Sequence, residues 1–173
     1  MGKYFGTDGF RGEANVNLTV EHAYKVGRFL GWYYGKNHED GKAKVVIGKD
    51  TRRSSYMFEY SLVAGLTASG ADAYLLHVTT TPSVSYVVRT EDFDCGIMIS
   101  ASHNPFYDNG IKLINDKGEK MREDVIDEIR KVFRWRYGGA SFCDKRKNRL
   151  YRGLYGRQKP LHGVSDEPCN LLL

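Results

Sequence analysis

The stretch CGIMISASHNPFYDNGIKLIN, residues 95–115, determines how the rest of the chain is interpreted. It opens with an unbroken apolar run whose length and composition are typical of a buried strand. A polar loop follows, which carries the adjacent pair Ser102 and His103. Asn109-Gly110 is a turn signal, and apolar residues return directly after it. The stretch therefore predicts a strand, a polar loop, and then a second strand or hairpin arm.

On both sides of this stretch, short apolar segments alternate with segments of helical periodicity. Thr19 is a typical N-cap, and Pro82 suits the first turn of a helix. We expect strands at 3–5, 44–50, 72–78, 95–100 and 109–115, and helices at 20–34, 56–69, 82–89 and 122–133. Such alternation is typical of βαβ units. It predicts a three-layer α/β/α domain with a mainly parallel mixed sheet over residues 1–133.

Three polar loops follow predicted strands: Gly6–Gly12, Gly48–Ser55 and Ser100–Asn109. In sheets of this class, ligands bind outside the carboxyl ends of the strands. We therefore expect the three loops to converge on one crevice.

Ser102 is the candidate nucleophile or phosphate carrier of that crevice. A serine takes such a role when it stands beside positive charge and a possible base. His103 is adjacent, and Lys112 lies ten residues further along the chain. The alternative is a polar turn in which Ser102 and His103 satisfy only backbone groups. No Ser-His-Asp triad follows from the spacing, and the sequence has no GxSxG elbow.

The other two loops carry weaker signals of phosphate binding. GTDGFRG matches neither the dinucleotide-binding motif GxGxxG nor a Walker A loop. Its glycines allow backbone N–H groups to approach an anion closely, and Arg11 adds a guanidinium suited to phosphate. GKDTRRSS places Lys49, Arg52 and Arg53 at a strand end. These three either recognise phosphate or are surface cations beside capping residues. Each motif alone is equally compatible with an ordinary turn.

Together, KYFGTDGFRGEAN, IGKDTRRSS and GIMISASHNPFYDNGIKL resemble the first domain of the α-D-phosphohexomutases, over about residues 3–133. GTDG-x-RG points to the branch of that family that acts on glucosamine phosphates. The resemblance implies that Ser102 is a phosphoserine and that His103 or Lys112 assists proton transfer to and from the sugar hydroxyl. The residues expected to bind the phosphate or substrate are Thr7, Arg11, Ser102, His103 and Lys112.

The reaction implied by this resemblance converts glucosamine 6-phosphate to glucosamine 1-phosphate by way of a bisphosphorylated sugar. The expected partner is thus a phosphorylated hexosamine. Mg²⁺ is the implied cofactor, with an oxygen of the phosphate on Ser102 as one ligand. The family's metal loop, sugar-recognition loop and second phosphate loop belong to three further domains, and their motifs do not occur in these 173 residues. We therefore expect the phosphoserine domain of such an enzyme, without turnover by this chain alone.

Two other functions remain open on the sequence. One is a stand-alone phosphosugar-binding or phosphoacceptor module, which would bind its ligand without further domains. The other is a fragment of a phosphoglucomutase or phosphomannomutase.

Residues 134–173 differ abruptly from the chain before them. They contain nine Lys/Arg against three Asp/Glu, a net charge of +6, whereas residues 1–133 have a net charge of −1. No strand or helix period continues through them. We interpret them as a basic, non-native tail produced by a shift of reading frame. Since this tail has no patterned face, we expect no nucleic-acid partner.

Composition excludes several other classes of protein. No apolar run approaches the roughly 20 residues of a membrane span, and the N-terminus lacks the apolar core of a signal peptide. The three cysteines are too few and too scattered for a disulfide framework or a CxxC metal site. We expect a cytoplasmic protein without a membrane partner.

Overall fold

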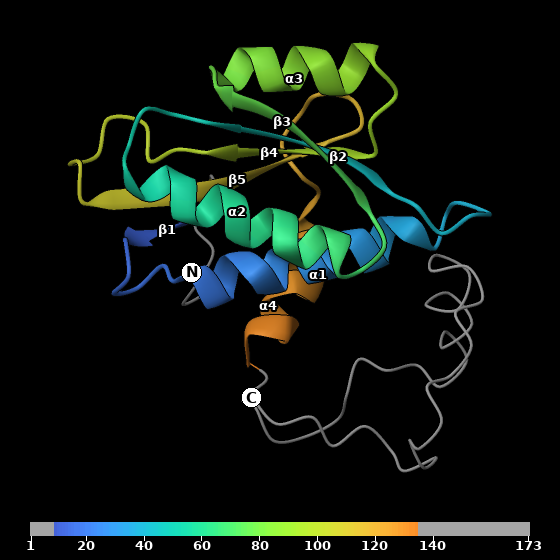
Figure 1. Ribbon diagram of the computed structural model, residues 1–173, viewed down its shortest axis with the longest axis horizontal. Helices are drawn as coiled ribbons and strands as arrows, with labels where there is room; N and C mark the ends of the chain where they lie inside the picture. The colour runs from blue at the N-terminus through green and yellow to red at the C-terminus, as the bar shows by residue number, and fades with distance from the viewer. Residues whose placement is uncertain (1–8, 135–173) are drawn as a thin grey trace, which may run out of the picture. The chain divides into compact units, whose positions relative to one another are not determined.

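The computed structural model describes residues 9–134 of the chain (Figure 1). The elements in chain order are β1 (Phe10–Glu13), α1 (Val20–Gly35), β2 (Lys44–Lys49), α2 (Ser54–Thr67), β3 (Asp72–Val78), α3 (Thr81–Thr90), β4 (Cys95–Ile99), β5 (Asp108–Asn115) and α4 (Glu123–Arg134). The strand expected at 3–5, the site residue Thr7 and the tail beyond residue 134 lie outside the described residues.

The strands form one mixed sheet in the order β1-β5-β4-β2-β3. β2 runs parallel to both β3 and β4. β5 is antiparallel to β4 and to β1. β5 is antiparallel to β4 because the chain returns from β4 through a loop that contains no helix. The strand expected at 109–115 is thus present, but Asn109 and Gly110 lie within β5, paired with β1, and not in the turn that their sequence indicates.

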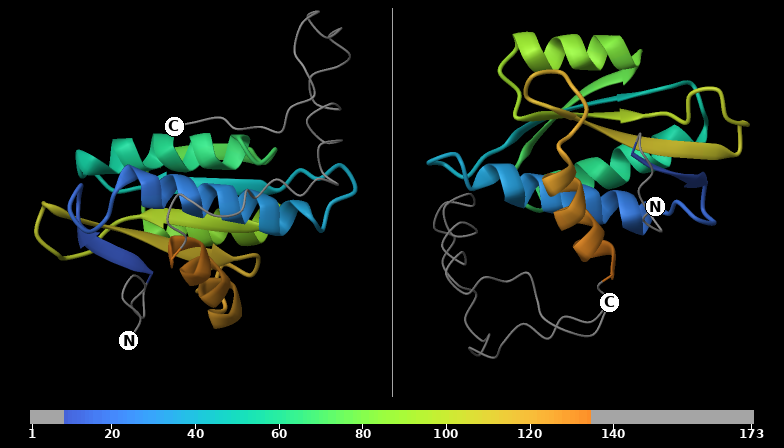
Figure 2. Two further views of the ribbon diagram at one scale, coloured as in Figure 1. Left: turned by 90° about the horizontal axis from the view of Figure 1, so that it is seen from below. Right: turned by 180° about the vertical axis from the view of Figure 1, so that it is seen from behind.

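Helices cover both faces of the sheet, as Figures 1 and 2 show. On one face, Val84 and Val88 of α3 pack against Val46 and Met98 of the strands. The larger core lies on the other face, where α1, α2 and α4 contribute. Its fully buried members include Phe58, and burying one such side chain contributes about 1.5–3 kcal/mol. The predicted three-layer α/β/α domain is confirmed.

Local sequence explains where the long helices begin and how they pack. The Thr19 hydroxyl accepts a hydrogen bond from the backbone N–H of His22, whose ring accepts one from the N–H of Thr19. Gly27 of α1 and Gly65 of α2 allow the two helix backbones to approach closely. A Cβ on Gly27 would lie 2.4 Å from the Leu62 carbonyl oxygen, so no larger residue fits without a shift of the backbone.

β1 differs from the sequence prediction. The loop expected over Gly6–Gly12 becomes a strand from Phe10 onward, where Arg11 lies opposite Gly110 of β5. This pairing joins segments about one hundred residues apart, so local composition could not reveal it. The chain enters β1 through Gly9, whose φ of +111° favours glycine.

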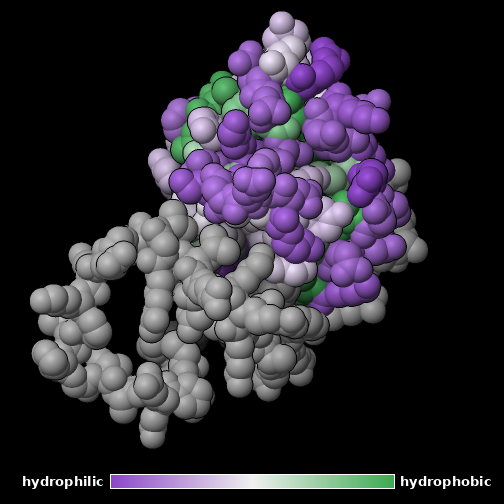
Figure 3. Space-filling model, turned by 90° about the vertical axis from the view of Figure 1, so that its right-hand side faces the viewer, coloured by the Kyte–Doolittle hydropathy of each residue, from purple (hydrophilic) through white to green (hydrophobic). Residues whose placement is uncertain are grey.

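The outer surface in Figure 3 is mostly hydrophilic, with small separate hydrophobic patches. Phe106, in the loop between β4 and β5, is 85% exposed and its ring stands edge-on to that of Tyr107. No helix among residues 9–134 is long and apolar enough to cross a membrane.

Candidate active site

The candidate site is the loop that joins β4 to β5, which we call the serine loop (residues 100–107). It projects beyond the ends of β2 and β4, at the left of Figure 1. Ser102 is exposed at its surface, and its backbone has a φ of +56°, in the left-handed region that a serine seldom adopts. Two bonds fold the loop locally: the Ser102 N–H donates to the Ser100 hydroxyl at 3.0 Å, and the Asn104 N–H donates to the Ala101 carbonyl at 3.1 Å.

Lys112 is the side chain that contacts the Ser102 hydroxyl. Its ammonium nitrogen donates a hydrogen bond to Ser102 Oγ at 2.8 Å. Lys112 is held in β5, opposite Met98 of β4, so its backbone belongs to the rigid sheet rather than to a loop. A positive charge in this position stabilises negative charge on the serine oxygen or on a phosphate attached to it.

His103 is also exposed on the serine loop, but its ring makes no hydrogen bond among the described residues. Of the two predicted proton-transfer groups, Lys112 is therefore the one in direct contact with Ser102 Oγ. His103 is thus exposed beside the same serine.

Arg11 reaches the serine loop from β1. Its guanidinium donates to the Asn104 side-chain oxygen at 3.4 Å, and the Asn104 amide in turn donates to Asp108 at 2.9 Å. Arg11 is exposed. The first and third predicted loops are thus brought together.

The second predicted loop contacts the serine loop through Arg52, for which the sequence left open either phosphate recognition or the role of a surface cation. Its guanidinium donates to the backbone carbonyl of Ser102 at 3.1 Å and to that of Asn104 at 2.7 Å. It also pairs with the Asp50 carboxylate. The Arg52 side chain is 13% exposed, so these contacts are largely shielded from water.

Asp50 anchors this arrangement as a charged group. Burial acts to raise its pKa, but hydrogen bonds from the Arg52 backbone, Ser55, Ser100 and the Arg52 side chain outweigh that effect and lower it. The Arg52 N–H donates to Asp50 at 3.0 Å, and the Ser55 hydroxyl does so at 2.8 Å. Asp50 therefore remains ionised and ties the start of α2 to the serine loop.

A buried asparagine links the start of β5, directly after the serine loop, to α2. Asn109, fully buried at the start of β5, donates from its amide to the hydroxyls of Ser54 and Ser55 at 2.8 and 3.0 Å. Its side-chain oxygen accepts from the N–H of Gly110. Both ends of the serine loop are therefore fixed to rigid elements.

Lys49 does not take part in the site, contrary to the phosphate-binding alternative. It is 1% exposed and pairs with the fully buried Glu59 of α2, while its ammonium lies 3.5 Å from the centre of the Tyr56 ring. An ammonium enclosed in this way has no open side for a ligand. Arg53, in contrast, is exposed at the start of α2.

No group of three or more His, Cys, Asp or Glu that could hold a metal ion occurs among residues 9–134. Asp50, the carboxylate nearest to Arg52 in this network, already accepts the bonds described above. These residues alone do not fit a complete Mg²⁺ site. A phosphate on Ser102 would supply an oxygen ligand from this chain, and the remaining ligands would have to come from elsewhere.

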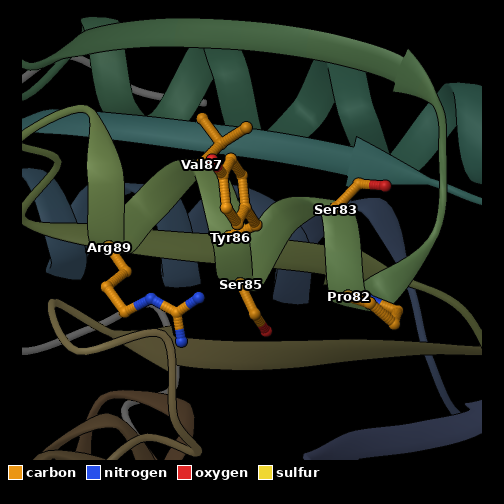
Figure 4. Close-up of a pocket in the computed structure, with 6 residues that line it drawn as sticks. All are labelled: Pro82, Ser83, Ser85, Tyr86, Val87 and Arg89. Atoms are coloured by element: carbon orange, nitrogen blue, oxygen red, sulfur yellow. The ribbon is translucent and has the colours of Figure 1, made fainter.

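A hollow of about 610 Å³ lies on the opposite side of the sheet from α1 and α2. Figure 4 shows its lining: Pro82, Ser83, Ser85, Tyr86, Val87 and Arg89 all come from α3. None of them belongs to the serine loop or to the loops that contact it, so this hollow is separate from the candidate site.

Known proteins share both the sequence and the fold of the described domain. The phosphoglucosamine mutase of Lachnospira eligens is 92% identical over 145 residues, which are 84% of this chain and 32% of that protein. The phosphoglucosamine mutase of Lachnoclostridium phytofermentans is 84% identical over 134 residues, 73% of this chain and 29% of that protein. The chain therefore spans about a third of the length of these relatives.

A solved structure, described as a putative phosphomannomutase from Thermus thermophilus, superimposes with a TM-score of 0.68. It is 28% identical and covers 76% of this chain, which matches 30% of that structure. The family profile of phosphoglucomutase/phosphomannomutase, alpha/beta/alpha domain I, matches residues 2–136. The chain belongs to the phosphoglucomutase/phosphomannomutase family and carries its alpha/beta/alpha domain I.

Proposed function

We propose that the chain is the phosphoserine-bearing part of a phosphoglucosamine mutase, with Ser102 as the phosphate carrier. The observation that carries the proposal is the hydrogen bond from the Lys112 ammonium to Ser102 Oγ, which places a cation and a proton donor at the oxygen that would hold the phosphate. The identity of 92% to a phosphoglucosamine mutase supports the choice of substrate class.

The proposed chemistry is transfer of a phosphoryl group between Ser102 and a sugar phosphate. The bond from Ser102 Oγ to phosphorus breaks as a bond forms from a sugar hydroxyl oxygen to phosphorus. Lys112 contacts Ser102 Oγ, so it is placed to return a proton to that oxygen as it leaves. The proton of the sugar hydroxyl goes to a base, for which exposed His103 is the candidate. The reverse step returns the sugar's other phosphate to Ser102.

Binding of the phosphate is the second proposed task of the site. Arg11 and Lys112 approach the serine loop from β1 and β5, and two cations offset much of the charge of a phosphate. Thr7 remains a proposed phosphate-binding residue outside the described part of the chain. The net reaction proposed is glucosamine 6-phosphate to glucosamine 1-phosphate through the bisphosphorylated sugar.

Mg²⁺ remains a proposed cofactor of the whole enzyme, because a bound divalent cation neutralises charge on a transferring phosphoryl group. The part proposed for this chain is one ligand, an oxygen of the phosphate on Ser102. Complete turnover is not expected from these 173 residues alone, since positioning of the sugar contributes a large part of the rate. The expected partial reaction is slow uptake of one phosphate.

Intact-mass spectrometry of the 173-residue chain after exposure to glucosamine 1,6-bisphosphate tests the proposal. The wild-type chain should gain the mass of one phosphate, and Ser102→Ala should gain none. Ser85→Ala is a matched control, because Ser85 lies on α3 away from the serine loop and should not affect uptake. A Ser102→Ala chain that still gains one phosphate, or a wild-type chain that gains none, would contradict the assignment.

A further inference from the structure

We propose that Arg52 is the positioning residue of the site: its guanidinium holds the Ser102 backbone in the left-handed conformation that presents the hydroxyl to Lys112. This inference rests on the proposed function, since it concerns the orientation of the same serine. It assigns Arg52 a role other than that of surface cation or phosphate ligand.

The first support is the pair of carbonyl contacts. One nitrogen of Arg52 donates both to the Ser102 carbonyl, at 3.1 Å, and to the Asn104 carbonyl, at 2.7 Å. These two carbonyls flank His103, so one planar group fixes the turn of the backbone on both sides of it. A lysine ammonium lacks the planar fork that joins such acceptors to a carboxylate at the same time.

The second support is the backbone conformation that these contacts hold. Ser102 has a φ of +56°, which L-residues other than glycine and asparagine disfavour. Such a conformation persists only where the surroundings over-determine it. The Ser102 N–H is satisfied by Ser100, and its carbonyl is satisfied by Arg52, so both peptide groups of the residue are fixed.

The third support is the rigidity of Arg52 itself. Its other nitrogen pairs with Asp50, which also accepts bonds from the Arg52 N–H and from Ser55 at the start of α2. The serine loop is thereby connected, through two charged side chains, to the end of β2 and to a helix. Rotation of the Arg52 side chain toward solvent would break its ion pair with Asp50 and its bonds to the Ser102 and Asn104 carbonyls together.

The burial of the Arg52 side chain argues against a role in ligand binding. The Arg52 side chain is 13% exposed, and both of its terminal nitrogens already donate to the protein. Its remaining nitrogen, Nε, is buried and has no hydrogen-bond partner, so it too is closed to a ligand. Arg11 is exposed and is the better placed guanidinium for the phosphate.

The test compares Arg52→Gln and Arg52→Lys with Arg53→Gln, which changes the exposed neighbouring arginine. The first measurement is the rate of phosphate uptake by the 173-residue chain as a function of glucosamine 1,6-bisphosphate concentration. Both Arg52 variants should lower the maximal rate, roughly 100-fold for Arg52→Gln, with little change in the half-saturating concentration. Arg53→Gln should behave as wild type.

The second measurement is amide hydrogen exchange, which needs no activity. In both Arg52 variants the amides of Ser102 and Asn104 should exchange faster, while those of the sheet keep their protection. If Arg52→Gln does not fold, the same comparison on Arg52→Lys decides the matter. This measurement stands even if the wild-type chain takes up no phosphate, so it distinguishes failure of this inference from failure of the proposed function.

Unchanged exchange at Ser102 and Asn104 would overturn the inference. So would a change in the half-saturating concentration alone, because that result would make Arg52 a phosphate ligand.

Discussion

Removing the carboxylate of Glu59 should destabilise the domain strongly. Glu59 is fully buried and Lys49 is 1% exposed, so Glu59→Gln leaves an ammonium enclosed in the protein without its counter-ion. Removal of one partner from a buried pair costs about 3–5 kcal/mol. The Tyr56 ring, 3.5 Å from the ammonium, contacts it before and after the change and does not alter the difference. We expect a loss of about 3 kcal/mol, since the glutamine amide retains one acceptor.

Urea denaturation of the 173-residue chain, followed by circular dichroism, measures this loss as a midpoint lower by roughly 1–3 M. The control is Glu128→Gln, whose partner Lys131 is 63% exposed and whose effect should stay below about 1 kcal/mol. The double variant Lys49→Met/Glu59→Leu should regain most of the stability, because no unpaired charge remains buried. A Glu59→Gln loss as small as that of the control would refute the buried-pair argument.

Two further predictions concern the site. Lys112→Ala removes the donor to Ser102 Oγ and should slow phosphate uptake roughly 100-fold or more. The control Lys117→Ala should leave the rate of uptake unchanged. Equal rates for the two variants would contradict the role of Lys112. Because the pKa of Asp50 is lower in the folded than in the unfolded chain, its carboxylate stabilises the fold above about pH 4, and this contribution is lost as the pH falls through the lower folded pKa. In thermal unfolding, Asp50→Asn should have a lower melting temperature than wild type at pH 7, and this difference should vanish in acid. Asp72→Asn, which changes an exposed carboxylate, is the control. A difference in melting temperature that persists in acid would contradict the argument.

The main elements of the fold follow from local sequence patterns. The cap at Thr19 marks the start of α1 within one residue, and the apolar run before Ser100 corresponds to β4. α2 begins at Ser54, two residues before the start that the apolar periodicity predicts. Ser54 and Ser55, which form its first turn, accept hydrogen bonds from the Asn109 amide. Local patterns thus predict element type well and helix ends less well.

β1 and Arg52 show what such patterns cannot predict. β1 exists because it pairs with β5 far along the chain, and its glycine-rich sequence alone indicates a loop. Arg52 and Arg53 are chemically identical neighbours in one loop, and only the folded structure turns one toward the serine loop and leaves the other exposed. Contacts between distant segments decide both cases.

The sequence also contains the information that Lys49 is a buried structural residue, if Lys49 is considered together with Glu59. A lysine at a strand end is compatible with phosphate binding when only its own loop is considered. Glu59, however, falls between Phe58 and Leu62 on the apolar face of α2, and a charged residue in such a position needs a buried partner. The burial of α2 therefore identifies Lys49 as a structural cation.

Peptide mapping by tandem mass spectrometry, after exposure of the chain to glucosamine 1,6-bisphosphate, tests the central claim most directly. It assigns the phosphate to a residue rather than to the chain as a whole. We expect a single phosphate, on Ser102. A phosphate on any other residue, or no phosphate on Ser102, would contradict this assignment.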